Sequence, residues 1–132
     1  MRLLALRGEE PPEPTVVIVR GGEMVPDHVR RTAIRAFEEF GFYGVSVFAA
    51  LDIDIAQLCA REPQLSRYGK IRLSTVGRLR QERFALIPTL HRPHFDLVLP
   101  DVSTDTLGRL EGVFDVPIPN PARRPKGTLE IV

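Results

Sequence analysis

The sequence has little of several features that would place a chain in a known class. Among its 132 residues there is one cysteine, Cys59, so the chain can form no internal disulfide, which suits a reducing compartment. No apolar run approaches the roughly 20 residues that a membrane-spanning helix needs, and the apolar start of the chain is too short for a signal peptide. We therefore expect a soluble, cytoplasmic protein with no membrane partner.

Net charge and catalytic motifs are also scarce. The formal net charge is +1, which excludes a uniformly basic surface for nucleic acid. The short motifs typical of dinucleotide-binding folds, P-loops, zinc proteases, thiol–disulfide enzymes and α/β-hydrolases are missing. His91 and His94 have a spacing that metal ligands use, but no cysteine or acidic set accompanies them, so we expect no metal site.

The chain does have enough apolar residues, 43%, to bury one core, and its length is that of one domain. The Gly/Glu/Pro-rich residues 8–14 predict a break in regular structure. We expect a flexible N-terminal segment over 1–13, a single α+β domain over 14–118 and a Pro/Arg-rich tail over 119–132. The last five residues of that tail, 128–132, could add an edge strand. The apolar helical stretch around Cys59 indicates a buried structural thiol.

Hydrophobic periodicity predicts strands that alternate with helices. Because the strands are short and 84–99 is typical of an antiparallel pair, we expect an α+β fold with short, mostly antiparallel strands and flanking helices, rather than a parallel α/β wrap. Ser74 and Ser103 are the predicted caps of the last two helices. The predicted strands are 15–20, 43–48, 70–73, 84–87 and 94–99, and the predicted helices are 26–40, 54–61, 75–81 and one that follows Ser103.

Arg20 is the strongest candidate for binding chemistry. It ends an apolar strand and precedes Gly21 and Gly22, and glycines let a ligand approach the backbone closely. A planar guanidinium at a strand end suits a phosphate or a carboxylate. The alternative is a surface arginine or the partner of a salt bridge.

Two further strands carry candidate side chains. Ser46 and Phe48 lie on one face of the strand 43–48, where the hydroxyl could bond a ligand and the ring could stack on an aromatic group. His94 shares a strand face with Asp96 and could act as a polarised base or a ligand donor. The alternatives are an ordinary half-buried strand and a histidine packed on a polar sheet face.

Residues 70–92 are locally basic. Nucleic acid or an acidic partner could bind there, although charged faces are usually only solvated and few aromatic side chains lie among these arginines. The candidate nucleic-acid or partner-binding residues are Arg78, Arg80, Arg83 and Arg92.

Taken in order, three of these segments resemble the ADP-ribosyltransferase-like toxin superfamily. That superfamily places an arginine at the end of its first strand, as at Val-Ile-Val-Arg20-Gly, and a serine on a later strand, as at Gly44-Val-Ser46-Val-Phe48. A late strand of the type His94-Phe95, ending here at Pro100, is similar to one in a small type VI secretion effector of that fold. The resemblance covers roughly a quarter of the chain.

The resemblance implies an ADP-ribosyltransferase-like fold and an intracellular bacterial toxin, possessing an NAD-binding pocket and neutralised by an antitoxin or immunity protein. Its target would be macromolecular, for example in the translation machinery. Arg20, with Gly21 beside it, would bind the NAD diphosphate, Ser46 and Phe48 would shape the nicotinamide pocket, and His94 would bond the substrate. NAD is the implied cofactor, and no metal is implied. We therefore expect Arg20, Ser46 and His94 to converge on one site.

The glutamate that usually completes catalysis in this superfamily has no clear counterpart. Glu130 lies on the possible late strand and Glu82 precedes another, but neither stands in the Glu-x-Glu or Gln-x-Glu context of the superfamily. Enzymatic transfer or consumption of NAD is therefore left open by the sequence.

Two other functions stay open. In a small ribonuclease toxin acting on tRNA or mRNA, His91 and His94 would be the acid and the base, and the arginines of 70–92 would hold phosphates. In a non-catalytic antitoxin, immunity protein or adaptor, Arg20, Ser46 and His94 would lie apart. Their positions in space discriminate between these functions.

Overall fold

The computed structural model describes residues 10–21 and 24–122, and in these residues strands and helices alternate along the chain. None of the helices in this part of the chain combines the length and apolar character that crossing a bilayer requires. The strands are β1 (Val16–Arg20), β2 (Tyr43–Ala49), β3 (Lys70–Thr75), β4 (Ala85–Pro88), β5 (His94–Leu99) and β6 (Ile118–Pro119). The helices are α1 (Pro26–Phe40), α2 (Ile55–Arg61), α3 (Pro63–Ser66), α4 (Val76–Gln81) and α5 (Thr104–Val113).

The strands form one antiparallel sheet in the order β4-β5-β2-β1-β3-β6. This confirms the expected α+β class with short antiparallel strands and the expected pairing within 84–99. β1 pairs with β3 along its whole length. With β2, however, it pairs only where Val17 faces Ala49 and Ile18 faces Phe48. Beyond these two pairs the strands part.

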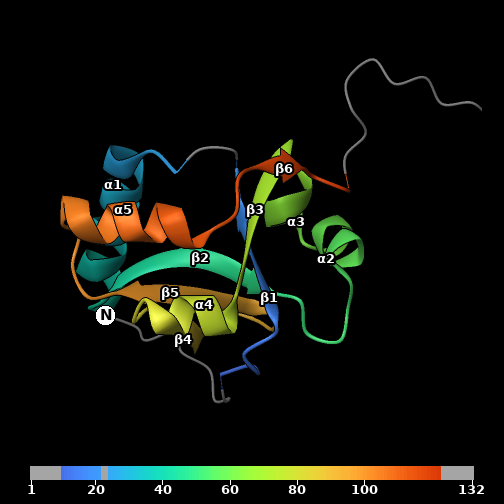
Figure 1. The fold of residues 1–132 in the computed structure, drawn as a ribbon, viewed down its shortest axis with the longest axis horizontal. Coiled ribbons are helices and arrows are strands. Elements are labelled where there is room, and N and C mark those ends of the chain that lie inside the picture. Colours follow the sequence, from blue (N-terminus) through green and yellow to red (C-terminus); the bar gives the residue numbers. More distant parts are fainter. Residues whose placement is uncertain (1–9, 22–23, 123–132) are drawn as a thin grey trace, which may run out of the picture.

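Helices cover the two faces of the sheet unequally. In Figure 1, α4 and α5 lie in front of β2 and β5, and the larger core fills the space between them. A smaller core lies on the opposite face, where α2 and α3 cover β1 and β3. Strand alternation divides the apolar side chains between these cores. The larger core contains Val17, Val45, Val47, Leu79, Phe84, Leu97, Leu107 and Leu110, and the smaller one Ile18, Phe48, Leu58, Cys59, Leu65 and Ile71.

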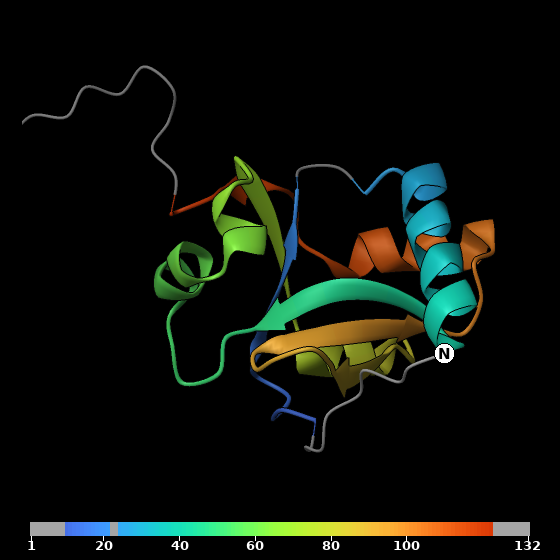
Figure 2. The same cartoon turned by 180° about the vertical axis from the view of Figure 1, so that it is seen from behind.

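No helix of the described residues covers one part of the second face. Figure 2 shows β2 and β5 from this side, uncovered between α1 and the α2–α3 pair. Ser46, Asp96 and Val98 lie on this part of the face and are half-buried. The polar residues of the two strands therefore face solvent where the helices leave the sheet open.

Capping residues explain where several helices begin and end. Pro26 stands in the first turn of α1, and Gly41 ends that helix at a φ of 87°, a conformation that favours glycine. Ser103 caps α5 as predicted, by accepting a hydrogen bond from the Thr106 N–H. The predicted Ser74 cap of α4 is wrong, because Thr75 accepts the bond from Arg78 instead.

Two elements of the structure are too short for periodicity to predict. α3 is a single turn that begins at Pro63, the proline that also ends α2. β6 adds two residues to the edge of β3, and Asn120 beyond it is 2% exposed. The start of the segment that we expected as a tail, 119–132, thus packs against the domain as far as the structure describes it. The possible strand 128–132 lies outside the described residues.

The first described residues also contact the domain. Glu10 and Glu13, which belong to the segment expected to be flexible, form ion pairs with Arg80 of α4 at 3.0 and 3.2 Å. Cys59 is fully buried between α2 and the sheet, and this burial raises the pKa of its thiol. The prediction of a structural rather than a reactive thiol is in accord with that position.

A buried arginine fixes the C-terminal end of α5 to the sheet. Arg72, on β3, is 6% exposed, and its guanidinium donates hydrogen bonds to the carbonyls of Asp115, Glu111 and Phe114 at 2.8, 3.2 and 3.3 Å. Phe114 caps the end of α5 and Asp115 follows it, while the Glu111 carbonyl also accepts the Phe114 N–H, so the guanidinium holds the whole end of the helix. The neighbouring Ser74 hydroxyl donates to the Val113 carbonyl at 2.7 Å.

We predict that Arg72→Leu lowers the free energy of unfolding by about 2–4 kcal/mol, because it leaves buried carbonyls without donors. Urea unfolding followed by circular dichroism measures this loss. The control is Arg78→Ala, which removes an exposed ion pair to Asp115 at 2.9 Å and should cost at most about 1 kcal/mol. Equal losses in the two variants would contradict the role of Arg72.

Candidate functional site

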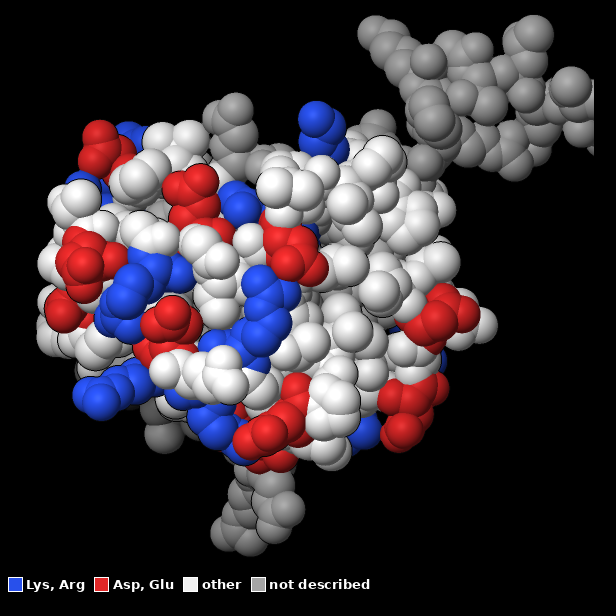
Figure 3. All heavy atoms as spheres, in the orientation of Figure 1, with Lys and Arg blue, Asp and Glu red and all other residues white. Residues whose placement is uncertain are grey.

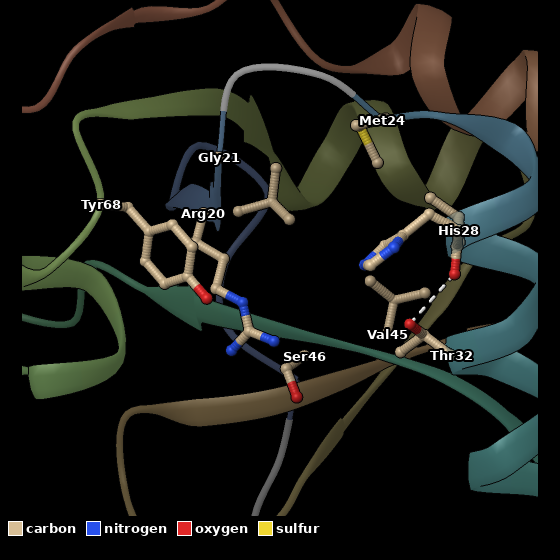
Figure 4. Close-up of a pocket in the computed structure, with 10 residues that line it drawn as sticks. Arg20, Gly21, Met24, His28, Thr32, Val45, Ser46 and Tyr68 are labelled. Carbon is tan, nitrogen blue, oxygen red and sulfur yellow. Dashed lines mark hydrogen bonds between the residues drawn. The ribbon is translucent and has the colours of Figure 1, made fainter.

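A pocket of about 240 Å³ opens where β1 and β2 part. If the β1–β2 register continued for two more residues, Arg20 would face Ser46, but the pairing ends at Ile18 and Phe48. The pocket passes between the strands, because its walls include side chains of both sheet faces, and α1 closes it on one side (Figure 4). Its walls consist of Val19, Arg20, Gly21, Met24, His28, Val29, Thr32, Val45, Ser46 and Tyr68.

Arg20 supplies the positive charge of this pocket. Its guanidinium carbon lies 5.4 Å from the centre of the Tyr68 ring, within the range of a cation–π contact. Figure 4 shows the arginine side chain running past that ring toward Ser46. Gly21 follows at a φ of 91° and donates its N–H to the Lys70 carbonyl, which keeps the end of β1 on β3. Among the described residues Arg20 has no carboxylate partner, so an anionic ligand can take that place.

The opposite wall of the pocket is apolar with two polar groups. His28 and Thr32 stand one helical turn apart on α1, and the Thr32 hydroxyl donates to the His28 carbonyl at 3.1 Å. In Figure 4 the His28 ring points into the pocket toward Arg20. Met24 and Val45 supply apolar surface on the same side. The pocket thus has a cationic, aromatic side and an apolar side that ends in an imidazole.

A carboxylate lies beside Ser46 on the next strand. Asp96 of β5 stands directly opposite Ser46 in the β2–β5 register, and such pairs have Cβ atoms roughly 4.5–5.5 Å apart on one face. A Cβ atom on Gly44 would lie only 3.2 Å from the Asp96 Oδ1, so this carboxylate reaches over the glycine. Alternation along β1 places Arg20 on the same face as Ser46 and Asp96. The sequence interpretation used Asp96 only as a neighbour of His94.

His94 does not line this pocket. It is 2% exposed, its Nδ1 is hydrogen-bonded to the Thr89 hydroxyl at 2.8 Å, and its ring meets that of Phe48 edge-on at 5.1 Å. Its Nε2 is buried and has no hydrogen-bond partner among the described residues. Burial in this place lowers the pKa of His94, against the opposing effect of the Asp96 charge.

The prediction that Arg20, Ser46 and His94 share one site is therefore only partly confirmed. Arg20, Gly21 and Ser46 line one pocket, whereas Phe48 and His94 pack together two register pairs further along, on the α2–α3 side of the sheet. Phe48 is 2% exposed and belongs to the smaller core, so it contacts protein rather than open pocket space.

The candidate basic residues do not form one uncompensated patch. On the face seen in Figure 3, Lys and Arg side chains alternate with Asp and Glu. Three of the four arginines named from the sequence lie near carboxylates, and the fourth, Arg83, follows α4 with a φ of 64°. The ion pairs are Arg78–Asp115 at 2.9 Å, Arg80–Glu10 at 3.0 Å, Arg80–Glu13 at 3.2 Å and Arg92–Asp52 at 4.0 Å.

The two glutamates considered for catalysis lie elsewhere. Glu82 caps the end of α4, and its Oε2 is 3.5 Å from the Arg109 guanidinium, away from the walls of the pocket. Glu130 lies outside the described residues. In residues 10–21 and 24–122 no group of three or more His, Cys, Asp or Glu side chains could hold a metal ion.

Sequence reasoning missed the apolar walls of the pocket and three of its polar side chains. His28 and Thr32 could have been found as a polar i, i+4 pair beside the apolar stripe of α1. Tyr68 had no such signal, because it lies in the irregular turn between α3 and β3.

Comparison with known proteins identified no relative of this chain. No protein-family model matches the chain, and no significant match was found among curated proteins or solved structures.

We predict that His94 makes the fold sensitive to acid. Since its pKa in the folded state lies below the unfolded value of about 6.5, the unfolded chain binds more protons between these values. The free energy of unfolding should therefore fall as the pH drops below about 6.5, by at most about 1.4 kcal/mol per pH unit from this group. Urea unfolding at about pH 7.5 and about pH 5 measures the loss.

His94→Asn removes the titration but keeps an amide nitrogen near the Nδ1 position, so this variant should lose less stability on acidification than the wild type. His28→Gln, at an exposed histidine, is the control and should behave as the wild type does. A His94→Asn protein as acid-sensitive as the wild type would contradict the assignment.

Proposed function

We propose that this chain is an ADP-ribosyltransferase-like toxin of the bacterial cytoplasm whose β1–β2 pocket binds NAD, and that an antitoxin or immunity protein neutralises it. The observation that carries the proposal is the position of Arg20 and Ser46. The parting of β1 and β2 lets Ser46 and Arg20, which has no carboxylate partner among the described residues, line one pocket. The resemblance to the superfamily assigns these same two residues to one site.

The composition of the pocket suits a ligand that joins phosphate groups to a planar ring. A guanidinium binds phosphate oxygens with two parallel N–H groups, which fits Arg20 to a diphosphate. The apolar wall formed by Val29, Val45 and Met24 suits a planar ring. Hydroxyl groups from Thr32 and Ser46 are available to hydrogen-bond the polar substituents of that ring or the adjoining ribose.

Asp96 is the carboxylate that we assign to this site in place of Glu82 or Glu130. Cleavage of the bond between nicotinamide and ribose develops positive charge on the ribose, and a nearby carboxylate stabilises such charge. Asp96 does not line the pocket, but it is half-buried directly opposite Ser46, so a ribose held by the Ser46 hydroxyl would have this carboxylate on the neighbouring strand. Arg20 would hold the ADP-ribosyl half in place through its phosphates while nicotinamide leaves with the bonding electron pair and a water molecule or an acceptor group takes its place on the ribose.

The two alternative functions have less support from the geometry. A ribonuclease that uses His94 would need its imidazole to touch RNA, but this ring is buried against Phe48. A non-catalytic module predicts that Arg20, Ser46 and His94 lie apart. His94 does lie apart from the pocket, but Arg20 and Ser46 line it together.

We predict that the purified wild-type protein binds NAD and that Arg20→Ala weakens this binding by about tenfold to a hundredfold, the loss expected for a hydrogen bond to a charged group. Isothermal titration calorimetry measures the affinity, and release of nicotinamide measures turnover. Asp96→Asn should retain binding and lose turnover, because the change removes the charge and keeps the shape. Arg35→Ala, on the exposed side of α1, is the matched control. A wild-type protein that neither binds nor consumes NAD would refute the proposal.

We predict that expression of the wild-type chain in a bacterium from a tightly repressed promoter arrests growth and lowers cellular NAD. Arg20→Ala should restore growth at an equal protein level, since the toxicity depends on the pocket. Colony counts and an enzymatic NAD assay measure the two effects. Growth arrest that persists unchanged in Arg20→Ala would show that the pocket is not the source of toxicity.

A further inference from the structure

Tyr68 has two guanidinium groups over its ring. The Cζ atom of Arg20 lies 5.4 Å from the ring centre, and that of Arg67 lies 5.8 Å from it. Arg20 and Tyr68 both line the pocket, and Arg67 lies outside its walls. The ring therefore connects the charged side of the pocket to a second cation outside it.

The turn that carries Tyr68 is held firmly in place. Asn120 donates hydrogen bonds from its Nδ2 to the carbonyls of Leu65 and Tyr68, both at 2.8 Å, and from its backbone N–H to the Gly69 carbonyl at 2.9 Å. Its side chain is buried, so water does not compete for these bonds. A fixed turn loses little conformational freedom when a ligand binds to it, which is what a preorganised binding surface requires.

The pocket alone is too small for a whole dinucleotide. Its volume of about 240 Å³ lies below the roughly 300–1,000 Å³ of pockets that enclose drug-sized ligands. A dinucleotide whose nicotinamide half enters between β1 and β2 must leave the pocket with its diphosphate and its second nucleoside. Arg20 and Tyr68 stand on the charged side of the pocket, and the exposed Arg67 lies over the same Tyr68 ring outside the pocket walls.

We propose that Arg67 and Tyr68 form an outer subsite that binds the diphosphate and the second nucleotide, and that this subsite makes the site selective for dinucleotides over mononucleotides. The inference rests on the proposed function. In this subsite Arg20 and Arg67 bind oxygens of the diphosphate. The Tyr68 ring, which contacts both guanidinium groups, keeps them in position. A mononucleotide gains only the contact with Arg20, because it ends before it reaches Arg67.

The test compares NAD with nicotinamide mononucleotide by isothermal titration calorimetry on the full chain. We expect the wild type to bind NAD more tightly than the mononucleotide. Arg67→Ala should weaken NAD binding by about tenfold or more and leave the affinity for the mononucleotide unchanged. Tyr68→Leu should also weaken NAD binding, whereas Tyr68→Phe, which keeps the ring, should bind as the wild type does. Arg35→Ala is again the matched control, and thermal unfolding of each variant confirms its fold.

The outcomes separate this inference from the proposed function. If the wild type binds NAD and Arg67→Ala binds it equally well, the outer subsite is refuted while the NAD pocket stands. Equal losses for both ligands in Arg67→Ala would also overturn the inference, because the residue would then act on the inner pocket. If the wild type binds neither ligand, the proposed function fails and the subsite fails with it.

Discussion

The site depends on one constraint in the sheet: β1 follows β3 to its end and leaves β2 after two pairs. Hydrogen bonding to β3 continues through Arg20, and the Gly21 N–H extends it by one more bond to Lys70. β2 instead remains with β5 along its length. The two central strands therefore belong to two diverging halves of one sheet, and the space between them becomes a pocket instead of a ladder of hydrogen bonds.

The polar residues on one face of β2 and β5 differ in burial because helices cover only part of that face. Phe48 and His94 face one another under the side of α2 and α3, and both are buried. Two pairs further along, Ser46 and Asp96 lie on the same face beyond those helices and stay half-buried. A shift of two residues along a strand, roughly 7 Å, thus separates a core histidine from a half-buried carboxylate.

Much of the fold could be predicted from the sequence, and less of the site. The strands and the long helices have regular apolar spacing, and Ser103 and Gly41 mark helix ends by their own chemistry. α3 and β6 are too short to show a period, and Tyr68 lies in a turn with no repeating pattern. Arg20 was found because a cationic residue after an apolar strand and before glycines is conspicuous in any context. His94 was predicted to contact a ligand and is instead buried. The alternating sequence pattern of a strand is the same whether or not a helix covers the histidine.

The sequence by itself determined the α+β fold class, the order of the longer strands and helices, and the placing of an arginine at the end of β1 and a serine within β2. These follow from local preferences, which act over a few neighbouring residues. Only the tertiary structure decided that Arg20 and Ser46 share a pocket, that Asp96 stands beside Ser46, and that His94 is buried away from them. Those facts depend on which strands pair, where a ladder stops and which helix covers which face, and all three are set by contacts between segments far apart in the chain.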